Sequence, residues 1–222
     1  EERKVYPMRK IVKLLPAALA LMLISPAFAA PSNSAESTMN ITVAPFINIK
    51  KLSEVNAANA QFDDDYTTLT TDKALGANFQ VINNEVGKVV YLTATCPSTG
   101  GNAKALYGED DKKLNIVFSN QTKASEIQDS YITNITSGSA TAKGDNPNCF
   151  ALSLTPTIEP DTSSGAETPT ASLEEQSVKY TLKNGVYAMN YAVGQNALAN
   201  TFSTHDTNGT YQATLTLTTT QP

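Results

Sequence analysis

Apolar and polar residues alternate with a period of two in several short segments of the chain. The clearest segment is 210–218, where Tyr211, Ala213, Leu215 and Leu217 alternate with Gln and Thr residues. A period of two puts the apolar side chains on one face of a β-strand. Further strands are predicted where short apolar or alternating runs lie between turn residues, at 39–43, 47–49, 79–82, 88–96, 114–118, 131–135, 149–155, 177–182 and 187–193.

Turn residues separate these segments. Asn83 to Gly87, Asn184-Gly185 and Asn208-Gly209 each predict a turn between strands. Residues 156–176 are rich in Pro, Thr, Ser, Glu and Gly, a composition that predicts a long exposed polar loop. Roughly eight to ten short strands with almost no long helix predict an all-β fold, an immunoglobulin-like β-sandwich.

The first 29 residues have the pattern of a secretory signal peptide. A basic stretch at 8–13 precedes an apolar run at 14–24 and the A-x-A sequence at 27–29. We therefore expect residues 1–29 to be removed and the rest to be secreted or held at the cell surface. The expected organisation is an N-terminal extension at 30–50, followed by a single β-sandwich domain at 51–222 that contains the polar loop.

The net charge of the chain argues against some classes of binding partner. The chain has a formal net charge of −5, and residues 1–29 carry five basic residues and two glutamates, so the remainder carries −8. An acidic surface argues against binding to nucleic acid or to anionic membranes. No apolar run after the signal peptide approaches the ~20 residues that a membrane span needs. We therefore expect neither nucleic acid nor a membrane span in the mature chain.

The two cysteines, Cys96 and Cys149, both lie after the signal peptide. In an oxidising compartment a single pair of cysteines predicts one disulfide. The alternative is a pair of reactive thiols, which normally has a motif such as C-x-x-C, and the sequence contains none.

Residues for catalysis are scarce. The one histidine, His205, is followed by Asp206, but adjacent residues do not form the nucleophile, base and orienting group of a triad. The acidic clusters 63–65 and 109–111 could offer oxygen ligands to Ca²⁺, but they lack the spaced pattern of a calcium loop. We interpret both as solvated loop charge. The sequence therefore predicts no enzyme, no cofactor and no metal site, and a hydrolase with a buried carboxylate is the least favoured alternative.

The two ends of the chain carry a family resemblance. Residues 209–220 read GTYQATLTLTTT and residues 40–44 read NITVA. These segments resemble the last strand and the donor strand of pilin subunits that are assembled by the chaperone–usher pathway, and of the related spore-coat-U-like secreted pilins. Such subunits are incomplete immunoglobulin-like sandwiches, and the N-terminal strand of the next subunit fills an apolar groove by β-strand addition.

The resemblance implies a structural subunit of a fimbria or pilus-like filament, with adhesion as a further role. It implies a homopolymer formed by strand exchange and a periplasmic chaperone as a possible partner. The candidate donor-strand residues are Met39, Ile41, Val43 and Ile47. The candidate groove residues on the last strand are Tyr211, Ala213, Leu215 and Leu217.

Two other interpretations fit the same pattern. The N-terminal strand can pair within its own domain, because the alternation is identical in both cases. The chain can also be a monomeric secreted or cell-surface binding module, with its site on loops such as 63–65, 97–104 or 156–176.

Overall fold

The computed structural model of the chain describes residues 36–55, 58–62, 64, 69–108, 114–132, 146–174, 176–195 and 204–221. The predicted signal peptide at 1–29 lies outside these residues, as does all of the acidic cluster 109–111 and most of the cluster 63–65. The chain divides into two units, 1–43 and 44–222. The described part of the first unit, 36–43, is neither helical nor a strand, and its side chains are exposed.

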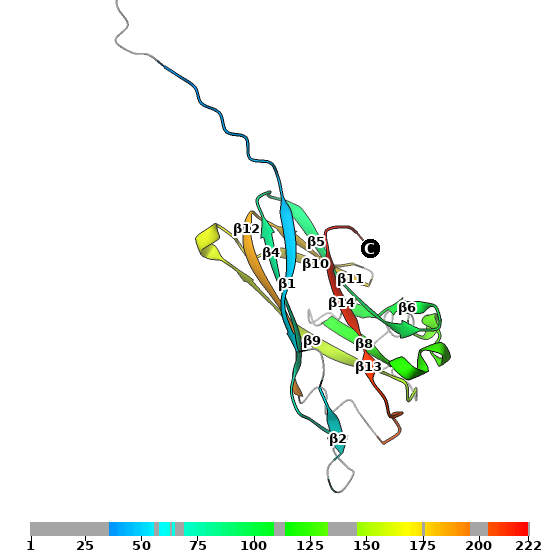
Figure 1. The fold of residues 1–222 in the computed structure, drawn as a ribbon. Coiled ribbons are helices and arrows are strands. Elements are labelled where there is room, and N and C mark those ends of the chain that lie inside the picture. The colour runs from blue at the N-terminus through cyan, green and yellow to red at the C-terminus, as the bar shows by residue number, and fades with distance from the viewer. Residues whose placement is uncertain are drawn as a thin grey trace, which may run out of the picture. The chain divides into compact units, whose positions relative to one another are not determined.

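The larger sheet of the second unit is antiparallel. Its strands follow the order β1-β4-β12-β9-β8-β13, and β7 also pairs with β8 (Figure 1). The bounds are β1 (Ile47–Val55), β4 (Leu75–Asn83), β7 (Leu106–Gly108), β8 (Leu114–Asn120), β9 (Cys149–Pro160), β12 (Gly185–Val193) and β13 (Tyr211–Gln212).

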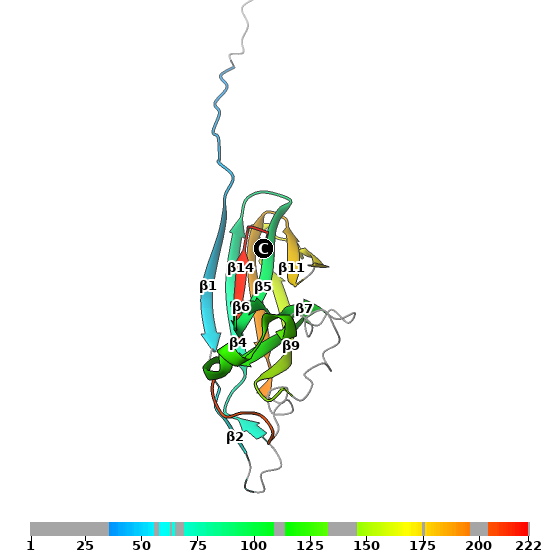
Figure 2. The ribbon, with the colours of Figure 1, turned by 90° about the vertical axis from the view of Figure 1, so that its right-hand side faces the viewer.

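The smaller sheet is also antiparallel. It has the order β10-β11-β5-β14, and β6 pairs with the C-terminal end of β5 (Figure 2). The bounds are β5 (Lys88–Ser98), β6 (Gly101–Lys104), β10 (Thr170–Glu174), β11 (Ser177–Leu182) and β14 (Thr214–Thr218). A separate hairpin is formed by β2 (Ala60–Phe62) and β3 (Leu69–Thr71), and two 3₁₀ turns are η1 (Gln121–Glu126) and η3 (Thr162–Ser164).

Residues from both sheets meet in one hydrophobic core. Tyr187, Met189 and Tyr191 alternate along β12 and are fully buried, while Leu92 on β5 is fully buried from the other sheet. The alternation that predicted strands is therefore the alternation that builds the core, and the all-β prediction is confirmed. Within the described residues, no helix is long and apolar enough to span a bilayer.

Most predicted strands coincide with observed ones, but four segments differ, and one of them is 210–218, where the predicted single strand is divided into β13 and β14. The segment 39–43 is not a strand, and Tyr131 and Ile132 from the segment 131–135 are helical. The predicted loop 156–176 contains the second half of β9, η3 and β10. Proline is tolerated in this part of β9 because residues 155–160 pair with β12 after the described register with β8 has ended at Leu154.

The predicted disulfide is not present: Cys96 and Cys149 are buried thiols. Cys96 lies on β5 and Cys149 begins β9, in the opposite sheet. Ser119 is the cross-strand neighbour of Cys149, and its hydroxyl donates to the carbonyl of Pro97, the residue after Cys96. Burial raises the pKa of the Cys96 thiol to about 11.

Candidate functional site

Two strands lie at the ends of their sheets, β1 in the larger sheet and β14 in the smaller one. In the part of the chain that the structure describes, β1 pairs with β4 and β14 pairs with β5, each on one side. The outer backbone groups of such edge strands are a template on which a further strand can pair. The last strand segment reaches this position because the chain crosses between sheets at Ala213, after β13 has paired with β8.

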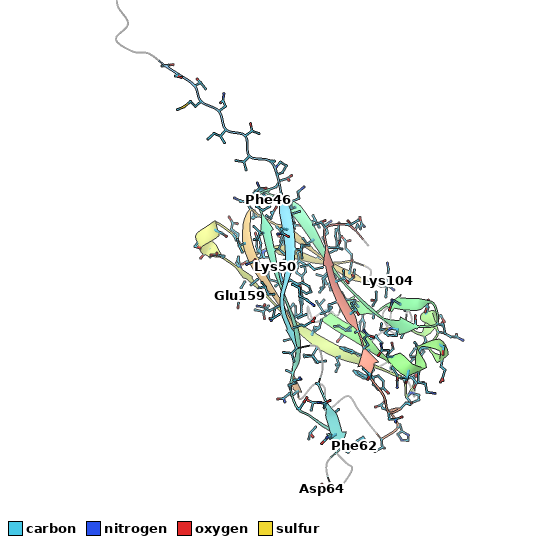
Figure 3. All side chains as sticks on the ribbon, viewed as in Figure 1. Phe46, Lys50, Phe62, Asp64, Lys104 and Glu159 are labelled. Carbon is cyan, nitrogen blue, oxygen red and sulfur yellow. The ribbon has the colours of Figure 1, made fainter. Side chains whose placement is uncertain are left out.

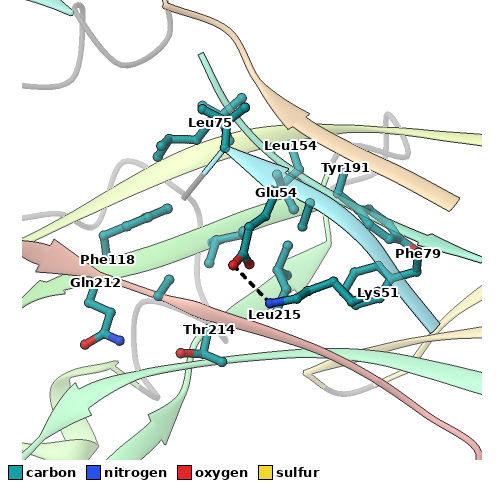
Figure 4. Close-up of a pocket in the computed structure, with 16 residues that line it drawn as sticks. Lys51, Glu54, Leu75, Phe79, Phe118, Leu154, Tyr191, Gln212, Thr214 and Leu215 are labelled. Carbon is teal, nitrogen blue, oxygen red and sulfur yellow. Dashed lines mark hydrogen bonds and ion pairs between the residues drawn. The ribbon is translucent and has the colours of Figure 1, made fainter. Parts of the chain in front are cut away.

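A groove lies between these two edges. It has a volume of about 400 Å³, and residues of β1, β4, β8, β9, β12 and the 212–215 segment line it (Figure 4). Its apolar wall comes from both sheets, through Leu75, Phe79, Ile116, Leu154, Tyr191 and Leu215. The groove is thus an opening into the hydrophobic core at the side of the molecule where two sheet edges face each other.

The aromatic part of the wall is formed by two rings in contact. The rings of Phe79 and Tyr191 meet edge to face, with centroids 6.1 Å apart and an interplanar angle of 64°. The Tyr191 hydroxyl donates to the Met189 sulfur at 3.9 Å. Burial raises the pKa of Tyr191 well above its ordinary value, and the neighbouring Tyr180 raises it further. Tyr191 is therefore neutral at physiological pH, and this wall offers shape and apolar surface.

Two charged side chains lie on the β1 side of the groove. Lys51 Nζ is 2.9 Å from Glu54 Oε1, and the two side chains are 57% and 36% exposed. Figure 4 shows the pair beside the apolar wall, facing Gln212 and Thr214 on the other side. The groove therefore has an apolar interior and a polar rim.

A second hollow adjoins the first. It has a volume of about 610 Å³ and lies between the β2–β3 hairpin and residues 209–213. It shares Leu75, Phe118, Gln212 and Ala213 with the groove. Amide and hydroxyl side chains line it from several elements, at Asn59, Gln61, Thr71, Gln121, Thr210 and Gln212.

The four predicted residues of the last strand each have a different position. Leu215 lines the groove, Ala213 lines both hollows, and Tyr211 lines the second hollow. Leu217 is 8% exposed and packs into the core. The Tyr211 hydroxyl contacts the carbonyl oxygens of Pro147 at 2.6 Å and Thr207 at 2.7 Å, and burial is the main cause that raises its pKa to about 12.

The predicted donor-strand residues fall into two groups. Met39, Ile41 and Val43 are 90%, 92% and 74% exposed. Ile47, in contrast, is the first residue of β1, pairs with Asn83 of β4 and is half-buried. The structure therefore separates an exposed apolar arm, residues 36–43, from a strand that belongs to the domain.

The residues considered for catalysis and metal binding are spread apart. His205 lies in an exposed turn before β13, with Asp206 beside it. Across the described residues, no group of three His, Cys, Asp or Glu side chains is arranged to hold a metal ion. Of the loops considered for a binding module, 97–104 is the end of β5 together with β6, and 156–176 is largely β9, η3 and β10.

The alternation in 210–218 predicted the β14 side of the groove, through Ala213 and Leu215, but no pattern in the sequence predicted the opposite wall. Phe79 and Tyr191 were recognised as strand residues, but no sequence signal indicates that β4 and β12 lie open beside β14. Lys51 and Glu54 were missed as well, because a charged residue near a strand end is normally an exposed one.

Comparisons of the chain with protein-family models, with curated proteins and with solved structures returned no match.

Proposed function

We propose that this protein is an exported structural subunit of a fimbria or pilus-like filament, assembled by β-strand complementation between copies. Its domain is an immunoglobulin-like sandwich that lacks one strand, and the groove between β1 and β14 is the place of that strand. The occupant is the arm of a second copy of the same chain. The role is structural rather than catalytic, and a periplasmic chaperone would cover the groove before assembly.

The observation that carries the proposal is an exposed arm whose pattern matches an open groove. Three large apolar side chains at alternate positions, Met39, Ile41 and Val43, are almost fully exposed. Contiguous exposed apolar surface on a soluble protein marks an interaction site. A strand with this alternation presents all three side chains to one side, which is what a groove leading into a core can accept.

The energies favour such an exchange. Burial of a large apolar side chain contributes about 1.5–3 kcal/mol, so burial of the three side chains contributes about 4.5–9 kcal/mol toward the contact. An added strand also pairs its backbone with the outer edges of β1 and β14, where each hydrogen bond adds about 1 kcal/mol. Because the arm and the groove are different surfaces, the contact is head-to-tail and extends into a filament instead of closing a dimer.

The test compares heated and unheated samples of the exported chain on SDS gels. We expect a ladder of heat-sensitive multimers for the unaltered chain and a single monomer band after deletion of residues 30–43. The deletion stops before Ile47, because β1 belongs to the domain.

Two substitutions sharpen the comparison. Ile41→Asp puts a charge on the apolar face of the arm, and Thr42→Asp puts the same charge on the next residue, which faces the other way in an extended strand. We expect the ladder to disappear with Ile41→Asp and to persist with Thr42→Asp. A single monomer band for the unaltered chain overturns the proposal.

The rival function, a monomeric secreted binding module, has one observation in its favour. The second hollow is large and lined by amide and hydroxyl side chains, such as Asn59, Gln61 and Gln121. A binding module of this kind gives a monomer in every lane of the gel, whatever residue stands at position 41.

A further inference from the structure

Asn84 holds the chain where the arm joins the domain. Its Oδ1 accepts from the Phe46 backbone N–H at 2.7 Å, and its Nδ2 donates to the Ala44 carbonyl at 2.9 Å. Its own backbone N–H donates to the Phe46 carbonyl at 3.3 Å. Three hydrogen bonds from one residue therefore extend the pairing of β1 with β4 beyond Ile47, back to Ala44. Figure 3 labels Phe46 at the start of β1.

These hydrogen bonds fix a segment that would have to bend if the arm entered the groove of its own domain. For the arm to lie alongside its own β1, the chain must reverse direction at residues 44–47. A β-turn there would use the Ala44 carbonyl as acceptor for the Ile47 N–H. That carbonyl already accepts from Asn84, so a turn there requires the Asn84 side chain to move or to share the oxygen. Pro45 adds to the restriction, because tight hairpins need positive φ at their first central residue and proline cannot adopt it.

The restriction matters because the arm is present at a much higher effective concentration at the groove of its own domain than at the groove of another copy. A tethered segment meets its site at an effective concentration of about 1 mM, whereas a second copy at ~10 μM is roughly 100-fold more dilute. If the arm could fold back, the chain would complete its own sandwich and remain monomeric. A device that blocks the reversal is therefore needed for exchange between copies.

We infer that Asn84 is a positioning residue that opposes self-insertion and so directs the arm of each copy to the groove of another copy. The inference rests on the proposed function. According to this inference, the Asn84 side chain determines whether the chain forms a filament or a closed monomer. The groove and the arm are the same in both cases.

The experiment uses the exported chain with three sets of substitutions. Pro45→Gly with Asn84→Ala removes both restrictions. Asn84→Asp with Pro45→Gly retains an acceptor for the Phe46 N–H and loses the donor to Ala44. Pro45→Gly with Asn78→Ala is the matched control, because Asn78 Nδ2 also donates from β4 to β1, to Ser53 Oγ at 2.8 Å, but away from the arm.

Two readouts follow each variant: the multimer ladder without heating, and the resistance of residues 36–43 to proteinase K, read by mass spectrometry. We expect the Asn84→Ala and Asn84→Asp chains to lose most of the ladder and to give monomers whose arm resists the protease. The Asn78→Ala chain should keep the ladder of the unaltered protein.

The outcomes separate the inference from the function on which it rests. A ladder that persists in both Asn84 variants overturns the role of Asn84 and leaves the filament intact. Monomers with a protease-sensitive arm in those variants also overturn it, because they show a failed donor rather than self-insertion. Monomers already in the unaltered chain overturn the proposed function itself, whether or not the arm resists the protease.

Discussion

Lys51 Nζ lies 2.9 Å from Glu54 Oε1, although residues three apart on a regular β-strand point to opposite faces. The register of β1 against β4 shifts between Lys51 and Ser53, so one extra residue is inserted there. This bulge brings both charges to the groove side of an edge strand. Charges that point inward on an edge strand oppose unwanted pairing with other strands.

We expect the Lys51→Val, Glu54→Val double variant to associate without the arm. The double variant is made in a chain that lacks residues 30–43, and its groove then has an apolar rim. We expect unspecific pairing of strand edges between molecules, which is measured as light scattering that increases with time. Lys50→Val is the control, because Lys50 lies on the same strand with its side chain on the other face. Equal scattering from the double variant and the control would show that the ion pair has no protective role.

Leu215→Arg should block the groove while the arm stays functional. The charged side chain occupies the apolar wall, so this variant donates its arm but accepts none. We expect no ladder from the variant alone and shortened ladders when it is mixed with the unaltered chain. Thr216→Arg, one residue further on β14 and exposed, should assemble normally. Normal ladders from Leu215→Arg would remove the groove from the assembly mechanism.

Both thiols should be unreactive in the folded protein. Cys96 and Cys149 are 0% exposed, and the raised pKa of Cys96, about 11, leaves very little thiolate at pH 8. We expect no reaction with Ellman's reagent under native conditions, and two thiols per chain in guanidinium chloride without reductant. Rapid native labelling contradicts the burial, and the absence of thiols after unfolding indicates a disulfide.

Alkaline pH should weaken the contribution of Tyr211 to stability. Its pKa is raised to about 12 in the folded state, against about 10 in the unfolded chain. Between these values the unfolded chain releases a proton that the folded protein retains, so the free energy of unfolding falls as pH rises. The contribution is complete below pH ~10 and is lost as pH rises through about 12.

Tyr211→Phe measures this effect in chemical unfolding experiments. The variant loses the hydroxyl contacts with Pro147 and Thr207, which lowers the free energy of unfolding by about 1 kcal/mol at pH 7. The difference between the two proteins should shrink from pH 10 to pH 12. A difference that is constant across this range contradicts the raised pKa.

The local parts of the fold were predictable and the long-range parts were not. The alternation in 177–182 and 187–193 corresponds to β11 and to most of β12, because burial of one strand face leaves a period of two in the sequence. The segment 210–218 shows the limit of that signal. Its alternation predicts one strand, but the chain changes sheets at Ala213, and periodicity does not indicate which neighbours a strand has.

Only part of the candidate site could be predicted, because alternation identifies strands but does not identify their neighbours. Leu215 and the exposed arm follow from alternation near the ends of the chain. Phe79, Tyr191 and Leu154 become groove residues through the order of the strands, which depends on pairing between distant segments. The prediction of a loop at 156–176 failed because it rested on a composition rich in Pro, Thr, Ser, Glu and Gly, and a strand with an open side accepts Pro156 and Pro160.

The crossing at Ala213 also governs when the domain can fold. Strand β14 closes the end of the smaller sheet and β13 the end of the larger one, and both come from one segment near the C-terminal end of the described chain. Thr93 and Thr216, which are joined by a hydrogen bond between β5 and β14, are 123 residues apart. Contacts of this range slow folding, because the loop between them must close first. Neither sheet can be completed until residues 211–218 have been made, so folding follows synthesis of the domain and does not accompany it.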